Sequence, residues 1–129
     1  MLFYFIICFL IPITMIILGI RWRKNPPKSM NYFYGFRTKR SMKNKDTWRF
    51  AHLHQSKLLL VSGILTIIVL LFLMFILKEQ FVKYVVFIIM AEILLQIMLI
   101  PITENKLKRT FNKSGKRIDK SNKKYSKKE

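Results

Sequence analysis

The chain has 129 residues, a length that fits one domain at most. Hydrophobic residues make up 52% of it, yet its formal net charge is +18. These two populations are separated into blocks, whereas a soluble basic domain would mix them within amphipathic elements. The pattern argues against a water-soluble domain and predicts an all-α membrane protein. The single cysteine, Cys8, lies inside an apolar block and allows no intramolecular disulfide.

The first apolar block, residues 1–20, is predicted to be a transmembrane helix, because such a helix needs about 20 mostly apolar residues. It ends at the sequence RWRK of residues 21–24, which places basic side chains and an aromatic anchor at headgroup depth. No basic segment precedes the block and no small-residue cleavage site follows it, so we expect it to be retained rather than removed as a signal peptide. Pro12 should kink this helix, because proline lacks a backbone donor.

Residues 58–77 and 81–102 are the second and third predicted transmembrane helices, joined by a tight connection of only three residues. The second contains no charged residue, and its small or polar residues Ser62, Gly63 and Thr66 share one face. Small residues let helices approach closely, so we expect this face to pack against another helix.

Glu92 lies close to the middle of the third predicted helix, where a carboxylate costs about 2.5 to 3.5 kcal/mol. The first two predicted helices hold no basic residue to pair with it, so desolvation should favour the neutral acid. Gln96 extends this polar stripe by one turn, and we expect the stripe to face Ser62, Thr66 or Thr14 inside the bundle. The stripe either senses a membrane-inserting ligand, lies on a proton or ion route, or forms an interhelical hydrogen bond that only holds the bundle together.

The distribution of Lys and Arg predicts the orientation. Residues 21–57 hold eleven of the 24, residues 105–129 hold eleven more, and the others are Lys78 and Lys83. With three spans, both basic segments lie on one side of the membrane, which is the cytoplasm under the positive-inside rule. We therefore expect a multi-pass protein of the cell membrane, with its N-terminus outside and its C-terminus in the cytoplasm.

Residues 103–129 form a basic tail with few apolar residues, so we predict that the tail is disordered. Each basic residue near a membrane surface contributes about 1 kcal/mol of attraction to anionic lipid. We therefore interpret the tail as a topogenic segment attracted to anionic headgroups of the lipid bilayer. The alternatives are a binder of an acidic protein or of nucleic acid, and we do not expect nucleic acid as a partner.

The basic loop of residues 21–57 is rich in aromatic residues and should contain a short interfacial helix that begins after Asn44, a good N-cap residue. One face of this helix holds four residues at i, i+3, i+4 and i+7 spacing: Trp48, Ala51, His52 and Gln55. A helix from Asn44 to Leu77 would be about 51 Å long, whereas the hydrocarbon core is about 30 Å thick. Its first turns should therefore project into the cytoplasm or bend along the membrane surface, and Trp48 and Phe50 favour the bend.

Three pieces of this loop form a specific combination directly before a predicted span. Residues 34–38 read YGFRT, residues 41–44 read SMKN, and residues 46–51 read DTWRFA. This combination resembles the signature of the SdpI family, which is named for a bacterial immunity protein that protects cells from a secreted toxic peptide. The resemblance covers roughly residues 20–105. It implies a multi-pass bacterial membrane protein, here in a short three-span form, with immunity or toxin-responsive signalling as the best-known family role.

The resemblance also implies candidate residues for binding a ligand or partner: Asn31, Tyr34, Gly35, Arg37, Thr38, Ser41, Asn44, Trp48 and Ala51. Arg37 is the charged residue of most interest, because a guanidinium holds phosphate or carboxylate in a bidentate fork. The alternative is that it orders the loop against headgroups or backbone carbonyls. His52 and His54 are two residues apart and point to different helical faces, so no metal site is expected.

No zinc-protease, hydrolase or phosphate-loop signature is present, so we expect neither an enzyme nor a cofactor. The leading hypothesis is an SdpI-type membrane protein that gives resistance to a membrane-active toxic peptide, which it would bind or exclude within the bilayer. One alternative is a signalling or scaffold protein that captures a soluble regulator on its basic cytoplasmic face. Another is a small transporter subunit, which would have to form a homo-oligomer.

Overall fold

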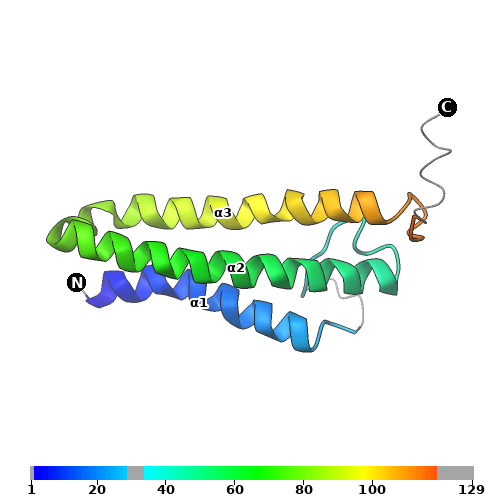
Figure 1. Ribbon diagram of the computed structural model, residues 1–129, viewed down its shortest axis with the longest axis horizontal. Coiled ribbons are helices and arrows are strands. Elements are labelled where there is room, and N and C mark those ends of the chain that lie inside the picture. The colour runs from blue at the N-terminus through cyan, green and yellow to red at the C-terminus, as the bar shows by residue number, and fades with distance from the viewer. Residues whose placement is uncertain (1, 29–33, 119–129) are drawn as a thin grey trace, which may run out of the picture.

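The computed structural model describes residues 2–28 and 34–118. Within these ranges the chain forms the long helices α1 (Leu2–Lys24), α2 (Lys45–Leu77) and α3 (Phe81–Thr110), with a turn of 3-10 helix, η1 (Lys78–Gln80), between the last two. No β-strand occurs in the described part of the chain, so the predicted all-α class is confirmed. The helices lie side by side, and α3 runs antiparallel to α2 because η1 reverses the chain (Figure 1).

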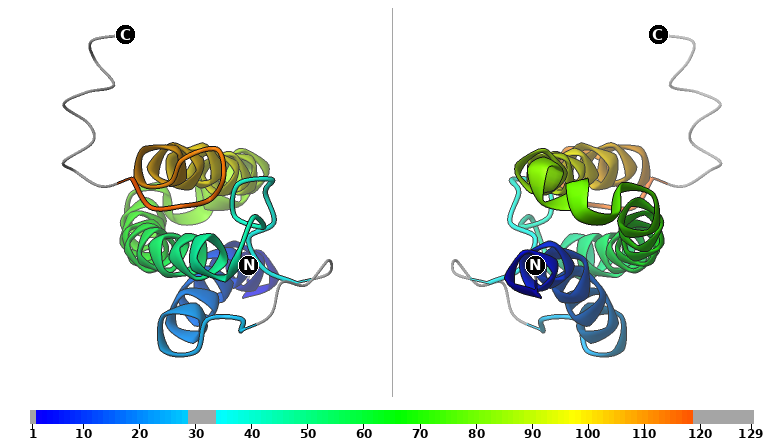
Figure 2. Two further views of the ribbon diagram at one scale, coloured as in Figure 1. Left: turned by 90° about the vertical axis from the view of Figure 1, so that its right-hand side faces the viewer. Right: turned by 90° about the vertical axis from the view of Figure 1, so that its left-hand side faces the viewer.

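The helices form an elongated bundle with two different ends. The start of α1 and the reversal at η1 lie at one end, which we call the turn end (Figure 1). The other end holds the last turns of α1 and α3 and the first turn of α2, and we call it the basic end, because Arg21, Arg23 and Lys24 lie in the last turn of α1 and Lys108 and Arg109 in that of α3. Seen along the bundle, α2 lies between α1 and α3 (Figure 2).

The outer surface of the bundle is apolar. Two stretches of helix are long and apolar enough to cross a membrane, Leu2–Lys24 and Lys45–Thr110, of which the second contains the reversal at η1. Large apolar side chains point outward along the helices; Phe72, Phe75 and Phe87 are 62, 78 and 70% exposed. Soluble monomers rarely expose apolar surface of this extent, whereas lipid solvates it. The fold is therefore that of a helical membrane protein.

The helix α1 bends part-way along its length (Figure 2), as expected of a helix that contains Pro12, and it packs closely against α2. A Cβ atom at Gly63 would lie 2.8 Å from the Ile16 side chain and 3.1 Å from the Pro12 carbonyl oxygen. A Cβ atom at Gly19 would lie 2.8 Å from the Leu60 side chain. Both distances are shorter than a normal van der Waals contact, so this helix spacing requires the two glycines. The prediction that the Gly63 face packs on another helix is confirmed.

The helix α2 is longer than the predicted second span, because it includes the residues assigned to an interfacial helix. It runs without interruption over Lys45–Leu77, and Asn44 is its N-cap, as predicted. The expectation that residues 45–57 bend away along the surface is wrong, since they continue α2 (Figure 1). The physical reason is that the protein itself covers their apolar face, where Trp48 and His52 are 1 and 0% exposed.

The predicted disorder of residues 103–129 is wrong for the first part of the tail. The helix α3 continues to Thr110, and residues 111–118 then fold back, with the Ile118 N–H donating to the Thr110 carbonyl oxygen (2.9 Å). We call residues 111–118 the return turn. Phe111 anchors the return turn, because its side chain is only 4% exposed. Residues 119–129 lie outside the described part of the chain.

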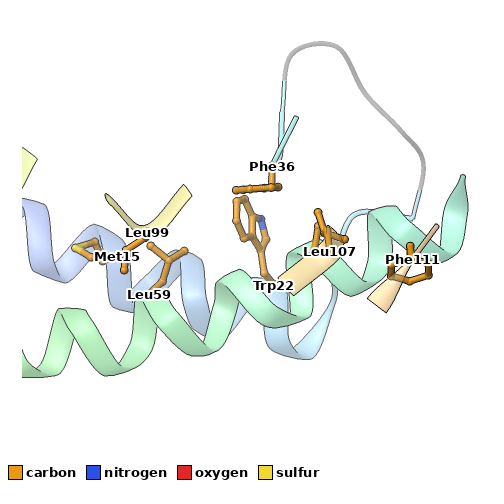
Figure 3. Packing of buried hydrophobic residues seen from close by; sticks show 8 residues of the cluster. Met15, Trp22, Phe36, Leu59, Leu99, Leu107 and Phe111 are labelled. Carbon is orange, nitrogen blue, oxygen red and sulfur yellow. The ribbon is translucent and has the colours of Figure 1, made fainter. Parts of the chain in front are cut away.

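Buried apolar side chains form two clusters, one toward each end of the bundle. The cluster toward the basic end contains Met15, Trp22, Phe36, Ala51, Leu59, Leu99, Leu107 and Phe111 (Figure 3). The cluster toward the turn end contains Cys8, Leu70, Phe81 and Val85. The buried polar residues Ser62 on α2 and Glu92 on α3 lie between these clusters along their helices. The bundle therefore has a polar position in the middle of an otherwise apolar interior.

Candidate functional site

Residues 34–44 form a loop that packs against the first turns of α2 and reaches α3, where Arg40 pairs with Glu104 at 3.7 Å. Most of the predicted binding residues meet in this loop and in the helical turns below it. We call the group the motif cluster; it consists of Tyr34, Gly35, Phe36, Thr38, Ser41, Asn44, Thr47, Trp48, Ala51 and His52. The helical face predicted from spacing is its floor, since Trp48, Ala51, His52 and Gln55 are all buried.

His52 attaches the loop to α2. Its Nε2 accepts a hydrogen bond from the Phe36 backbone N–H (2.9 Å), and its Nδ1 donates to the Trp48 carbonyl oxygen one helical turn earlier (2.7 Å). Only the neutral tautomer with its hydrogen on Nδ1 satisfies both partners. Burial lowers the pKa of His52 below its usual value, which favours the same neutral form.

Gly35 brings the loop backbone directly against this histidine. Its φ is +114°, a conformation that glycine adopts readily and other residues rarely do. A Cβ atom here would lie 2.5 Å from His52 Nε2 and 3.0 Å from the edge of the Trp48 ring. The glycine of the motif is therefore required twice, once by the backbone angle and once by the close approach.

The hydroxyl residues of the motif close the loop and begin α2. Ser41 Oγ donates to the Phe36 carbonyl oxygen (2.7 Å) and accepts from the Thr38 N–H (2.8 Å). The Thr47 hydroxyl donates to the Ser41 carbonyl oxygen (3.0 Å). It also accepts from the Asn44 N–H (3.0 Å), while the Asn44 side chain accepts from the Thr47 N–H (2.8 Å), which completes a capping box. These bonds satisfy backbone groups that the loop would otherwise bury without a partner.

Two tryptophans from different helices enclose His52. The ring of Trp22 on α1 lies 4.7 Å from the imidazole, and the ring of Trp48 on α2 lies 4.3 Å from it. Each indole N–H is also used: Trp22 donates to the Tyr34 hydroxyl (2.9 Å), and Trp48 donates to the Pro27 carbonyl oxygen (2.8 Å). Two positions in the segment between α1 and α2, Pro27 and Tyr34, are thereby held by tryptophan side chains whose indole N–H groups are satisfied.

The return turn covers the start of α2. Asn44 Nδ2 donates to the Gly115 carbonyl oxygen (2.7 Å), and Arg117 makes two hydrogen bonds to the Asp46 carboxylate, each 2.8 Å long. These hydrogen bonds lower the pKa of Asp46 and raise that of Arg117. The N-cap of α2 is therefore shared between the loop and the segment that follows α3.

One of the predicted binding residues that the structure describes, Arg37, does not belong to this buried arrangement. Arg37 is exposed and makes no hydrogen bond or ion pair within residues 2–28 and 34–118. Among the described residues, Arg37 therefore has no partner through which it would order the loop. Asn31 lies outside the described residues.

A pocket of about 370 Å³ lies beside the motif cluster, between the end of α1 and the start of α2. Four cationic side chains line it, and we call it the basic pocket: Lys24, Lys28, Lys45 and Arg49. The ring of Trp48 forms part of its wall. The N-terminus of α2 adds the positive end of a helix dipole, so the basic pocket is suited to an anionic group.

Glu92 lines a groove of about 360 Å³ between α2 and α3. The side chain is 5% exposed, and neither carboxylate oxygen has a hydrogen-bond partner among the described residues. Ser62 and Thr66 line the same groove, as expected, but their hydroxyls donate within α2, to the carbonyl oxygens of Leu58 and Ser62 respectively. Apart from these three side chains the lining is apolar, and we call it the Glu92 groove.

The predicted polar stripe is shorter than expected. Gln96 is half-buried and is not among the residues that line the Glu92 groove. Thr14 is exposed on α1, and its hydroxyl donates to the Ile11 carbonyl oxygen (2.7 Å). Among the described residues, Glu92 is the acidic residue buried in the bundle interior.

Sequence reasoning missed the role of His52. The spacing placed it correctly on the buried face, but its hydrogen-bond partner is a backbone N–H that lies 16 residues earlier in the chain. The available signal was the combination of a histidine one turn after Trp48 with a glycine in an aromatic run. No group of three His, Cys, Asp or Glu side chains that could hold a metal ion gathers within the described ranges.

These features define a class: a helical membrane protein with a buried, hydrogen-bonded polar cluster at its basic end and a polar groove in its apolar interior. The SdpI/YfhL protein family matches residues 28–103, more than half of the chain, and the chain belongs to this family. It is 44% identical over 50 residues to the uncharacterized protein YfhL of Bacillus subtilis (strain 168). That match covers 39% of this chain and 46% of the relative, so it extends over about half of the relative's length. No solved structure matches the chain.

Proposed function

We propose that the chain is a three-span SdpI-type membrane protein that gives its host resistance to a membrane-active toxic peptide. The observation that carries the proposal is the family match over residues 28–103, a range that contains the whole motif cluster and the whole Glu92 groove. Immunity is the role for which the family is named, and the apolar outer surface of the bundle supports a location in the membrane, where such a peptide acts.

In this proposal α1, α2 and α3 each cross the membrane, with the basic end in the cytoplasm. The 33 residues of α2 extend for about 50 Å, about 20 Å more than the hydrocarbon core. The surplus corresponds to the first turns of α2, which carry the motif cluster. Lys and Arg concentrate at this end, as the positive-inside rule requires of a cytoplasmic surface.

The peptide would be bound or excluded within the bilayer by the outward faces of α2 and α3. These faces present large apolar side chains, including Phe72, Phe75 and Phe87. In lipid, helices associate through van der Waals packing and interhelical hydrogen bonds rather than through the hydrophobic effect. A helical peptide that packs there would be removed from the pool that damages the membrane.

A challenge experiment tests the proposal. The chain is expressed in a peptide-sensitive bacterial host, which is then exposed to a panel of secreted membrane-active peptides. We expect the inhibitory concentration of at least one peptide to rise several-fold, and Trp48→Ala to remove the protection because it opens the motif cluster. Arg109→Ala, an exposed change at the same end, is the matched control, with membrane levels compared by immunoblot. Unchanged sensitivity across the panel would contradict the proposal.

A second candidate function is signalling, in which the basic end captures a soluble acidic regulator. The exposed Arg37 and the basic pocket favour it, because both offer cationic groups that have no acidic partner among the described residues, on the surface proposed to be cytoplasmic. Affinity capture from the host, with the full chain, with Arg37→Ala and without residues 119–129, which leaves α3 and the return turn intact, tests this function. Loss of one acidic partner in both variants supports signalling, and the absence of any partner counts against it.

A further inference from the structure

The Glu92 groove holds an acidic group whose hydrogen-bonding capacity is unused. Glu92 is 5% exposed, and both of its carboxylate oxygens lack a hydrogen-bond partner among the described residues. Ser62 and Thr66, whose hydroxyls line the same groove, donate instead to backbone carbonyl oxygens of α2. A buried carboxyl group without a partner costs several kcal/mol, so its retention in an apolar bundle needs a purpose beyond packing.

No basic side chain of the described residues supplies the missing partner. Lys83 is on the same helix, but nine residues away, which corresponds to about 13 Å along α3. The ion pairs within the described ranges are Arg40 with Glu104 and Arg117 with Asp46, both at the basic end. The partner of Glu92 must therefore come from outside these residues.

The groove has the dimensions and the access that a small ligand requires. Its volume of about 360 Å³ lies at the lower end of the range of ligand pockets, about 300 to 1,000 Å³. Leu65 and Val69 of α2 and Leu95 of α3 form its rim and are 56, 53 and 36% exposed. The groove thus opens on the outer face of the bundle, so a ligand dissolved in lipid can enter it sideways.

We propose that the Glu92 groove binds a lipophilic amine, with the alkyl part against the apolar wall and the protonated amino group donating to the Glu92 carboxylate. Charge complementarity selects this ligand class. An ammonium group supplies up to three hydrogen-bond donors and a positive charge, and the described residues offer the Glu92 carboxylate neither a donor nor a cation. A neutral lipid chain fills the same apolar volume but leaves both oxygens without a partner. The inference requires that the bundle lies in lipid, and it does not require that the chain protects any cell from a peptide.

Photolabelling of the full chain in phosphatidylcholine nanodiscs tests the proposal. The probe is a dodecyl primary amine that carries a diazirine in its chain, and its matched control has a methyl group in place of the amine. We expect the amine probe to label residues that line the groove, as located by mass spectrometry, and an unlabelled alkylamine to compete for the site. Labelling by the methyl probe should be weaker and should not be displaced by the amine.

Four variants separate the carboxylate from the volume of the groove. Glu92→Gln keeps the shape and removes the charge, and Val69→Phe fills the groove and keeps the charge; each should weaken amine binding by about tenfold or more. Glu79→Gln removes a carboxylate at the exposed turn end, and Val86→Phe adds the same bulk on an exposed face of α3, and both should bind like the wild-type chain.

Equal labelling by the two probes, or unchanged binding to Glu92→Gln, would overturn the proposal and leave the groove as a place for lipid chains. Because this measurement uses purified protein, its result is independent of the peptide challenge. A chain that binds amines without protecting cells would contradict the proposed function alone, and a protective chain that does not bind amines would contradict this inference alone.

Discussion

The contact between Gly35 and His52 decides whether the loop docks on α2. Replacing Gly35 by Ala puts a Cβ atom 2.5 Å from His52 Nε2 at a backbone angle that alanine rarely adopts. We expect the loss to be about 1 to 3 kcal/mol in the free energy of unfolding. Denaturant unfolding of the purified chain in detergent measures it, and the exposed neighbour Arg37→Ala should change the same quantity by less than about 0.5 kcal/mol.

The same histidine makes the loop sensitive to acid. Its pKa in the folded chain is lowered by burial, so the unfolded state binds more protons as the pH falls through the unfolded value of about 6.5. The bond between His52 and the Phe36 N–H thus contributes fully above about pH 6.5 and is lost progressively below it. We expect the hydrogen-exchange protection of the Phe36 amide, corrected for the intrinsic rate, to fall below this pH.

Two histidine variants separate this effect from general acid sensitivity. His52→Gln removes the titrating group at the loop and should abolish the pH dependence of the Phe36 amide. Burial and the nearby Lys106 and Lys57 also lower the pKa of His54, but its Nδ1 contacts the Thr103 hydroxyl on α3 (3.2 Å), and it makes no hydrogen bond to the described loop residues 34–44. His54→Gln should keep the pH dependence; if His52→Gln keeps it too, His52 is not the switch.

Between elements, the closest contact joins α1 and α2 at Gly63. Leucine at this position would push its side chain into Ile16 and toward the Pro12 carbonyl, so the two helices would have to separate. Overpacking of this kind costs about 1 to 3 kcal/mol. Thermal unfolding in nanodiscs should show a lower midpoint for Gly63→Leu, whereas Val61→Leu, on the exposed face of α2, should unfold like the wild-type chain.

The return turn is held by two interactions of different strength. Phe111 is 4% exposed and packs its ring against Phe50 at 5.4 Å, whereas the pair of Arg117 with Asp46 lies on the surface, with both side chains about half exposed. Phe111→Ala should therefore destabilise the chain by about 3 kcal/mol or more, and Arg117→Ala by about 1 kcal/mol or less. Denaturant unfolding of both variants checks this order, and a larger effect of Arg117→Ala would reverse our ranking of the two contacts.

The elements could be predicted from local patterns, and the loop could not. The apolar blocks and the N-cap residue Asn44 predicted the helices, because these signals depend only on residues that are close together in the sequence. Docking of the loop depends on the hydrogen bond from the Phe36 N–H to His52, which lies 16 residues later in the chain. It also depends on the positive φ of Gly35, which the presence of a glycine in the sequence does not by itself indicate. The return turn was not predicted, because the composition of the tail as a whole is polar and basic and indicates disorder, whereas the fold of the turn depends on one buried side chain, Phe111. Glu92 was identified from its position near the middle of the third apolar block. The groove beside it could not be predicted, because it depends on how the side chains of α2 and α3 pack.

For the whole molecule, the proposed topology predicts which ends a membrane-impermeant reagent can reach. In a Cys8→Ser background, Lys28→Cys and Lys113→Cys at the basic end should react with an impermeant maleimide only after the cells are permeabilised. Glu79→Cys at the turn end should react in intact cells, since η1 is exposed. Reaction of Lys28→Cys and Lys113→Cys from opposite sides would contradict three spans, because an odd number of crossings would then separate the two basic segments, whereas three spans place two crossings, α2 and α3, between them.

The unbroken course of α2 has a mechanical consequence. This single helix forms one wall of the Glu92 groove in the half that is proposed to lie in the membrane, and it carries Trp48 and His52 of the motif cluster near its N-terminus, with no break between the two. If this helix leans by about 10°, its protruding length of about 20 Å swings the tip sideways by about 3 Å. Wedging α2 away from α3 at mid-membrane would thus displace the positively charged tip as a lever arm does.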